Sequence, residues 1–246
     1  IAWKLRHSPL LSKLLVAPGN AGTAVIAENV PIASSDIDLM VDCALRQRID
    51  LTVIGPEAPL AAGIVDRFHA EGLKVFGPSR AAAKIESSKS FAKELMMRAG
   101  VPTGGAETFD DYEKARGYVE SAPTPVVIKA DGLAAGKGVV ICPDASTAAV
   151  AVRRMLETME FGDAGGTILA EEFLSGPEAS VFALTDGRTL VPLETCQDHK
   201  TLLEGNKGPN TGGMGAVSPN SKVGERMRDN IERQILLPTL HGMNCE

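Results

Sequence analysis

The chain has 246 residues, of which 44% are hydrophobic and 4% aromatic, and its formal net charge is −6. That is enough apolar sequence for one large domain or two smaller ones, and no apolar run is long enough to span a bilayer. Acidic and basic residues are interspersed, which argues against a nucleic-acid partner. The four cysteines lie far apart, so they predict neither a disulfide framework nor a zinc site. They fit a reducing compartment, and we expect a cytoplasmic protein.

The first hundred residues alternate short apolar runs with stretches of helical spacing. Strands are expected at residues 13–17, 51–54 and 74–76, and helices at 36–48 and 61–70. Runs of this kind bury both faces, as the strands of a parallel sheet do. Ligands bind such sheets at the loops that follow the strands. The first part of the chain is therefore predicted to form an α/β unit with a parallel sheet, with candidate binding loops at 18–23, 55–60 and 77–79.

The remaining elements are predicted in the following order. A helix at 88–98 is closed by Gly100, with Pro102 behind it. A helix at 112–121, strands at 125–130 and 139–142, and a helix from 144 or 146 to 155 follow. A strand at 167–170 precedes a hairpin of residues 179–185 and 189–193, joined through Asp186-Gly187. The pattern is helical from Glu225 onward.

The most informative segment is KADGLAAGKG, residues 129–138, which we call the glycine loop. Its small residues let backbone N–H groups approach a phosphate, and its lysines supply positive charge. It is not a Walker A loop, because only three residues separate Gly132 from Gly136 and Gly138 stands where Ser or Thr holds magnesium. It is typical of a lid over a triphosphate, but an ordinary glycine-rich hairpin turn is an equally good interpretation.

Two later segments have the composition of a ligand site. The strand end AEEFLSGPE, residues 170–178, could read the edge of an adenine, and Glu178 could accept hydrogen bonds from ribose hydroxyls. An edge strand with solvated glutamates is the alternative. QDHK, residues 197–200, precedes GPNTGGMG, residues 208–215, which is too rich in glycine to form a regular element. No serine or cysteine nucleophile motif lies near His199, so a catalytic triad has little support.

Together these segments resemble the phosphoribosylamine–glycine ligase family of ATP-grasp enzymes. The similarity rests on PGNAGTA, GPEAPL, VFGPS, ESSKSFAKE, VVIKADGLAAGKGV, AEEFLSGPEAS, QDHK and GPNTGGMGA, in that order along nearly the whole chain. QDHK followed by GPNTGGMG is the most specific of them. The resemblance implies an α/β fold with an incomplete Rossmann-like N-terminal domain at 1–103, an ATP-grasp lid at 104–170 and a partial ATP-grasp core at 171–246.

The resemblance also implies the reaction and the site. ATP, glycine and 5-phosphoribosylamine would give glycinamide ribonucleotide, ADP and phosphate through glycyl phosphate, with Mg²⁺ or Mn²⁺ as the metal. The nucleotide-binding residues would be Lys89 or Lys93, Lys129, Gly132, Gly136, Lys137, Gly138, Glu171, Glu172, Phe173, Leu174 and Glu178. Those that meet the substrates and phosphates would be Asp198, Lys200, Asn210, Thr211, Gly212, Gly213, Met214 and Gly215. The phosphoribosylamine pocket would be shaped by Pro18, Gly19, Asn20, Gly22, Thr23, Gly55, Pro56 and Glu57.

The sequence departs from the family pattern in several places. The family's N-terminal GxGGREH turn and its metal-binding segment resembling EFNCRFGDPE are absent from these residues, so we expect a chain truncated at both ends. Smaller differences from the family pattern lie at Pro177, at Cys196 and at residues 205–207. Without the metal ligands we expect a poor or inactive ligase, and with an incomplete sheet we expect poor solubility. Another ATP-grasp carboxylate–amine ligase, or a non-catalytic nucleotide-binding module, is the alternative.

Overall fold

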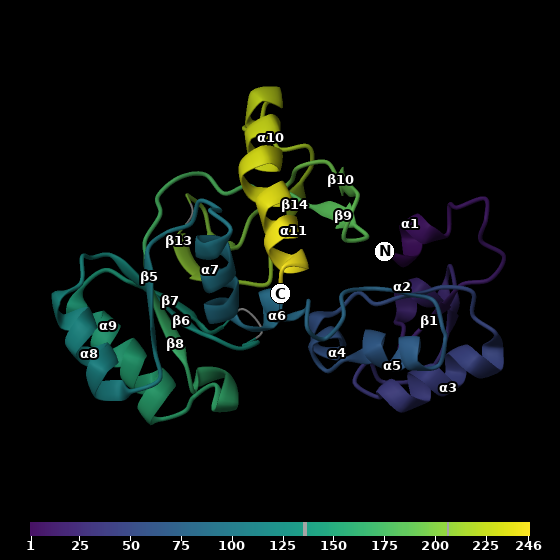
Figure 1. The fold of residues 1–246 in the computed structure, drawn as a ribbon, viewed down its shortest axis with the longest axis horizontal. Coiled ribbons are helices and arrows are strands. Elements are labelled where there is room, and N and C mark those ends of the chain that lie inside the picture. The colour runs from purple at the N-terminus through teal and green to yellow at the C-terminus, as the bar shows by residue number, and fades with distance from the viewer. Residues whose placement is uncertain (135–136, 206) are drawn as a thin grey trace. The chain divides into compact units, whose positions relative to one another are not determined.

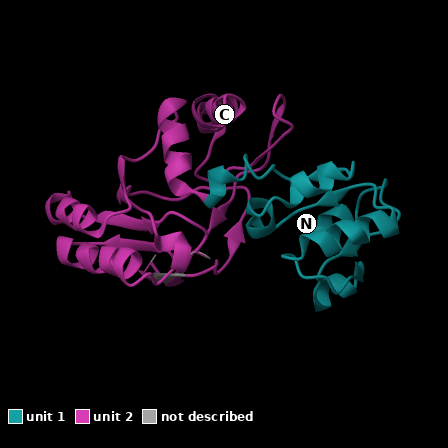
Figure 2. Cartoon of the chain, turned by 60° about the horizontal axis from the view of Figure 1, so that its bottom comes forward, with its two compact units in different colours: residues 1–87 teal, residues 88–246 magenta. Residues whose placement is uncertain are grey.

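The computed structural model describes residues 1–134, 137–205 and 207–246, together with the backbone but not the side chains of Pro209 and Asn210. The chain forms two compact units, Ile1–Ser87 and Ser88–Glu246 (Figure 2). Among the described residues, no helix combines the length and the apolar character that crossing a bilayer requires. Each unit is considered by itself.

The first unit alternates short parallel strands with helices, as predicted for a Rossmann-like domain. β1 pairs with β2, and β3 pairs with β4, both in parallel. Its core is formed by α3 and α5, where Val41 and Ala44 pack with Ile64, Val65 and Phe68. The elements are α1 (Ala2–Leu5), β1 (Leu15–Val16), α2 (Ala21–Ala24), β2 (Glu28–Asn29), α3 (Ile37–Gln47), β3 (Thr52–Val53), α4 (Glu57–Ala61), α5 (Ile64–Ala70), β4 (Val75–Phe76) and α6 (Lys84–Ser87).

The predicted helix at 36–48 shows how local sequence sets the bounds of an element. The Asp36 carboxylate caps the first turn by accepting a hydrogen bond from the N–H of Leu39 at 3.3 Å. Arg48 ends the helix in the left-handed conformation, with φ of 52°. The three predicted strands are confirmed, although each is shorter than expected.

The second unit is built on a four-stranded antiparallel sheet with the order β5-β8-β6-β7 (Figure 1). Helices α8 and α9 pack together and against this sheet, and the buried side chains between them form the largest core of the unit. The elements are α7 (Lys89–Arg98), β5 (Ala106–Phe109), α8 (Tyr112–Ser121), β6 (Val126–Ala130), β7 (Val139–Cys142), α9 (Ala145–Val152), a π-helical turn (Arg153–Glu157), a 3-10 turn (Gly162–Gly165) and β8 (Ile168–Glu172).

Three smaller antiparallel pairs and a C-terminal helical segment complete the unit. They are β9 (Ala183–Thr185) with β10 (Leu190–Pro192), β11 (Gln197–Asp198) with β14 (Ala216–Val217), β12 (Thr201–Leu203) with β13 (Lys207–Asn210), and α10 (Glu225–Ile231), a π-helical turn (Glu232–Leu236) and α11 (Leu237–Asn244). The hairpin through Asp186-Gly187 is confirmed. The prediction that residues 208–215 form no regular element is wrong for 208–210, which belong to β13.

Strands β2, β5 and β11 to β14 have no counterpart in the predicted elements, and β5 is the one that belongs to the four-stranded sheet. β5, Ala106–Phe109, pairs along one side of β8 only, and its two central residues are exposed. A four-residue edge strand of this kind lacks the continuous apolar run that marks a buried strand. The division of the second unit near residue 170 stays a prediction, and β8, Ile168–Glu172, runs through that position.

Ile128 tests whether the four-stranded sheet carries the stability of this unit. Its side chain is 0% exposed at the centre of β6, so Ile128→Ala should lower the free energy of unfolding by about 3 kcal/mol. Ile141→Ala is the matched control, because Ile141 lies on the neighbouring strand β7 and is 50% exposed. Urea unfolding followed by circular dichroism measures both. Equal losses in the two variants would contradict this assignment of the core.

Candidate active site

A buried ion network joins helix α7 to strands β6 and β8. Lys93, on α7, is 5% exposed, and its Nζ donates hydrogen bonds to Glu171 Oε1 at 2.7 Å, Thr103 Oγ1 at 2.6 Å and the Gly104 carbonyl at 2.9 Å. Lys129, near the end of β6, forms an ion pair with the other oxygen of the same carboxylate, Oε2. All three donor sites of the Lys93 ammonium are therefore satisfied inside the protein.

The charge of Glu171 depends on this network. Burial by itself raises the pKa of Glu171, but its hydrogen bonds to Lys129 and Lys93, with their positive charges, outweigh burial and hold the pKa below its usual value. Glu171 is therefore ionised at neutral pH, and the network of two lysines and one carboxylate has a net charge of about +1. A partly buried site with this charge favours an anionic ligand.

The glycine loop starts and ends at fixed points. The N–H groups of Ala130, Asp131 and Gly132 donate to the carbonyls of Gly138, Thr167 and Ala164 at 2.8, 2.9 and 3.1 Å. A Cβ at Gly132 would lie 2.8 Å from the Ala164 Cβ, and a Cβ at Gly138 would lie 2.7 Å from the Ala134 Cβ. Only glycine fits at these two positions. Ala135 and the predicted phosphate contact Gly136 lie outside the described residues.

Lys89 and Lys93, which the sequence leaves as alternatives, occupy different surroundings. Lys89 Nζ donates to the backbone carbonyls of Asp131 and Gly132 at 3.3 and 3.0 Å, so it holds the first residues of the glycine loop. Lys93 is one turn further along α7 and contacts Glu171 directly. Lys89 therefore supports the loop, and Lys93 contributes a buried positive charge to the ion network. Lys137 is exposed.

The end of β8 presents the residues predicted to border an adenine. Glu172 is exposed, and its Oε2 accepts a hydrogen bond from the N–H of Gly105 at 3.1 Å. Its own N–H donates to the carbonyl of Gly105 at 2.8 Å. Phe173 and Leu174 follow with 38% and 65% exposure. β8 therefore delivers a partly buried carboxylate, Glu171, and directly after it accessible backbone and apolar side chains.

The segments QDHK and GPNTGGMG differ in composition, but they fold onto each other. β11 pairs with β14 and β12 with β13, and Thr211 bonds the carbonyl of Lys200 through both its N–H, at 2.7 Å, and its Oγ1, at 2.8 Å. Gly213 has φ of +114°, and a Cβ there would lie 2.9 Å from Asp198 Oδ1. The glycines thus let the backbone pass the Asp198 carboxylate closely. The side chain of Asn210 lies outside the described atoms.

Lys200 and Glu178 form an ion pair between the two predicted halves of the site. Lys200 Nζ lies 2.5 Å from Glu178 Oε1, and the two side chains are 41% and 57% exposed. Such an exposed pair contributes little to stability, about 0–1 kcal/mol. Both groups therefore remain accessible to a ligand.

In the first unit, the predicted binding loops follow parallel strands as expected. Asn20 caps α2, because its Oδ1 accepts from the N–H of Thr23 at 2.9 Å and Thr23 Oγ1 accepts in return from the N–H of Asn20 at 2.7 Å. Gly19 has φ of +77°, and a Cβ there would collide with Asn29. Gly55 and Pro56 lead from β3 into α4. β1 and β3 belong to separate strand pairs.

Comparison with known proteins identifies the family. Residues 1–86 match the N domain of phosphoribosylglycinamide synthetase, and residues 87–246 match the ATP-grasp (A) domain of the same enzyme. The chain belongs to the phosphoribosylglycinamide synthetase family. The two family domains meet next to the boundary between the two compact units at Ser87 and Ser88.

Individual relatives are named phosphoribosylamine–glycine ligase. The chain is 51% identical over 245 residues to phosphoribosylamine–glycine ligase from Ralstonia nicotianae, covering 99% of this chain and 58% of the relative. It is 47% identical to the ligase of Escherichia coli O6:H1, covering 100% and 58%. The chain therefore spans a little over half the length of these relatives.

Solved structures extend the comparison to the fold. A phosphoribosylamine–glycine ligase from Thermotoga maritima superposes with a TM-score of 0.81 at 30% identity, covering 98% of this chain and 57% of that one. A biotin carboxylase from Campylobacter jejuni superposes with a TM-score of 0.71 at 19% identity, covering 94% and 53%. The second likeness concerns the fold alone.

Several residues of the candidate site were not identified from sequence. Thr103 and the Gly104 carbonyl complete the hydrogen bonding of Lys93, and Asp131 links the glycine loop to α7. Buried Asn220 donates through Nδ2 to the carbonyls of Glu178 and Cys196, at 3.5 and 3.4 Å. Each acts on a partner distant in the chain, so local sequence carries no signal for it, apart from the polar Asp131 inside a loop of small residues.

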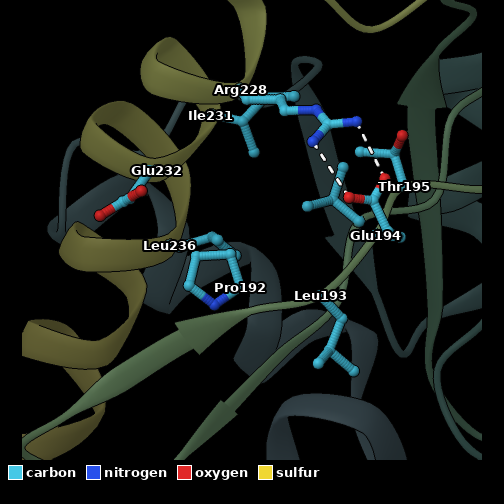
Figure 3. A pocket seen from close by; sticks show the side chains of 9 residues that line it. Pro192, Leu193, Glu194, Thr195, Arg228, Ile231, Glu232 and Leu236 are labelled. Atoms are coloured by element: carbon cyan, nitrogen blue, oxygen red, sulfur yellow. Dashed lines mark hydrogen bonds and ion pairs between the residues drawn. The ribbon is translucent and has the colours of Figure 1, made fainter. Parts of the chain in front are cut away.

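A separate cavity of about 330 Å³ lies between the β9–β10 hairpin and the C-terminal helices (Figure 3). Arg228 spans its rim to Glu194, with hydrogen bonds of 2.9 and 3.3 Å. The glycine loop and the Lys93 network contribute no residue to it. It is lined by Val181, Pro192, Leu193, Glu194, Thr195, Arg228, Ile231, Glu232 and Leu236.

Removing the Glu171 charge should destabilise the second unit. Glu171→Gln leaves the buried Lys93 without a counter-charge, so the free energy of unfolding at pH 7 should fall by about 3 kcal/mol. Glu107→Gln, on the exposed part of β5, should change it by less than about 0.5 kcal/mol. Urea titration gives both values. A Glu171→Gln protein as stable as the control would contradict the assigned network.

The same network predicts a pH dependence. The folded-state pKa of Glu171 is lowered, so its stabilising contribution is fully present above the ordinary carboxyl pKa, about 4.3. It is lost as the pH falls through the lower folded-state value. The stability difference between wild type and Glu171→Gln should therefore be constant from pH 7 to about pH 5 and shrink below about pH 4. Thermal unfolding across this range measures it, and a difference that grows on acidification would refute the sign.

Proposed function

We propose that this chain carries the ATP site of a phosphoribosylamine–glycine ligase. The reaction joins glycine to 5-phosphoribosylamine with ATP, giving glycinamide ribonucleotide, ADP and phosphate through glycyl phosphate. The observation that carries the proposal is the Lys93–Glu171–Lys129 network beside the glycine loop, in a chain whose relatives have this name. Two lysines and a backbone loop at one place are the chemistry that a triphosphate requires.

The nucleotide would extend from β8 to the glycine loop. Its phosphates would meet Lys93, Lys129 and the loop through Lys137, while the exposed end of β8 after Glu171 would receive the adenine. The ribose hydroxyls would bond Glu178, which exchanges its present partner Lys200 for them. Lys200 would then be released toward the phosphates, which would compensate its charge.

The acceptor side would be formed by Asp198 and the GPNTGGMG segment folded against it, with Asn210 as a further polar group. Thr211 and Gly213 hold this segment to Lys200 and Asp198, so its backbone would contact the reacting groups closely. Phosphoribosylamine would bind at the loops 18–23 and 55–60 of the first unit. The glycine carboxylate would attack the γ-phosphate of ATP and release ADP. The amine would then attack the carbonyl carbon of glycyl phosphate and release phosphate, so no protein nucleophile is needed, and the protein would act by positioning and electrostatics.

ATP is expected to bring a divalent metal ion, Mg²⁺ or Mn²⁺. Within the part of the chain that the structure describes, no three His, Cys, Asp or Glu side chains gather in an arrangement that could hold one. The described residues therefore do not form a metal site by themselves, and no step is assigned to the metal.

Nucleotide affinity tests the proposal directly. Lys129→Met removes a charged contact to phosphate, and Lys93→Met removes a positive charge beside it, so each should weaken ATP binding roughly 10- to 100-fold. Lys114→Met, on the exposed side of α8, should leave it unchanged. Isothermal titration of the 246-residue chain measures the three dissociation constants. Equal ATP affinity in all three variants would overturn the assignment of the phosphate site.

Ligation distinguishes this activity from a non-catalytic nucleotide-binding module or from another ATP-grasp ligase. The chain can replace the aligned part of the E. coli relative, to which it is 47% identical. This chimera should release phosphate only when glycine and phosphoribosylamine are both present, and Lys129→Met should lower kcat/KM by about 100-fold or more. A chimera that binds ATP but ignores both substrates would favour the binding module.

A further inference from the structure

Asp131, the first residue after β6, connects the start of the glycine loop to the start of helix α7. Its carboxylate accepts hydrogen bonds from the N–H of Ser90 at 2.6 Å and from Ser88 Oγ at 3.1 Å. Its carbonyl accepts from the N–H of Lys89 at 3.1 Å and from Lys89 Nζ at 3.3 Å. Side chain and backbone of one residue are therefore both fastened to the same helical turn.

Helix capping alone does not account for these contacts. α7 already has its own cap, because Ser88 Oγ accepts a hydrogen bond from the N–H of Phe91 at 3.2 Å. Asp111 and Asp144 cap α8 and α9 in the usual way, each at the start of its own helix. Asp131 reaches α7 from 41 positions away. An anion at a helix N-terminus is stabilising, but here its main effect is to join two distant segments.

The two segments carry the lysines of the proposed phosphate site. Lys129 lies two residues before Asp131 on β6, and Lys93 lies one turn after Ser90 on α7. A carboxylate between these segments fixes the glycine loop relative to both ammonium groups. The N–H groups at the start of α7 are occupied, that of Ser90 by the Asp131 carboxylate, that of Lys89 by the Asp131 carbonyl and that of Phe91 by Ser88. The phosphates must therefore be bound by the lysines and the loop, and not by this helix end.

We propose that Asp131 is a positioning residue for the phosphates of ATP, which holds the glycine loop in register with Lys93 and Lys129. The inference rests on the proposed function. A loop released at this end still has its backbone donors, but it has to be ordered when the nucleotide binds, and that ordering weakens binding. Adenine and ribose contact other elements, so the loss is confined to the phosphate part of the ligand.

The ratio of ATP affinity to adenosine affinity measures this role. Asp131→Ala should lower ATP affinity roughly tenfold or more while adenosine affinity stays within about twofold, and Asp131→Asn, which retains an acceptor for Ser90, should have a smaller effect. Asp144→Ala is the matched control, since it removes an aspartate that accepts from the N–H of Thr147 at 2.7 Å. It should lower the melting temperature without changing the ratio. Isothermal titration with ATP and with adenosine gives all values.

A second pair of variants tests the contact from the helix. Ser90→Pro removes the N–H that Asp131 accepts from, at a first-turn position where proline is tolerated. Ser90→Ala keeps that N–H and is its control. Ser90→Pro should reduce the ratio of ATP affinity to adenosine affinity, and Ser90→Ala should not. This pair tests the role of Asp131 even if Asp131→Ala fails to fold.

The outcomes separate the two proposals. A wild-type ratio in Asp131→Ala or, if that variant fails to fold, in Ser90→Pro would overturn the role of Asp131 and leave the ATP site intact. A wild-type chain that binds ATP no better than adenosine would reject the proposed phosphate site, and the role of Asp131 with it. A parallel loss of ATP and adenosine affinity would assign Asp131 a purely structural role and so overturn the inference.

Discussion

The burial of Lys93 constrains the second unit more than any other single feature. An ammonium group that is 5% exposed would cost several kcal/mol without compensation. The fold supplies a carboxylate from β8, a hydroxyl from Thr103 and a carbonyl from Gly104. α7, the segment before β5, and β8 must therefore meet at one place. Lys129 adds β6 to this set through the same carboxylate, so four segments are located by one ion network.

The ion network around Lys93 also determines where the glycine loop lies. Its first residues continue β6 from Lys129, are bonded to Ala164 and Thr167, and are fastened to α7 through Asp131 and Lys89. The tight contacts at Gly132 and Gly138 leave no room for a side chain. Small residues are thus required for the packing at the ends of the loop, and the proposed phosphate site would require them a second time, for the close approach of backbone to a phosphate. The first requirement holds even in the absence of ligand.

Sequence reasoning was most accurate where the signal is local. The apolar run of β6, the capping aspartates of α3 and α9, and the Asp186-Gly187 turn all lie within a few residues of the feature that they specify. It was least accurate where an element depends on a distant partner. β5 is a strand because β8 lies beside it. Gly208 belongs to a strand because β12 pairs with that segment. The partners of Lys93 belong to the second kind, since Thr103 has no local pattern that would mark it.

At Lys93 and Glu171, the proposed binding of phosphate and the stability of the second unit depend on the same contacts. At other positions the two can be changed separately. Two adjacent ammonium groups repel each other, and Glu171 holds them together before any anion arrives, so the charge of the site is preorganised. At a site prepared in this way a phosphate would bond Lys129 without that lysine having to move, which lowers the cost of binding. Lys93, whose three donors are already used, would act through its charge. Changing Lys93 or Glu171 alters the fold and the site together. Lys137, exposed on the glycine loop, carries charge without that constraint, so substitution there can change the attraction for phosphate while the core around α7 and β8 stays intact.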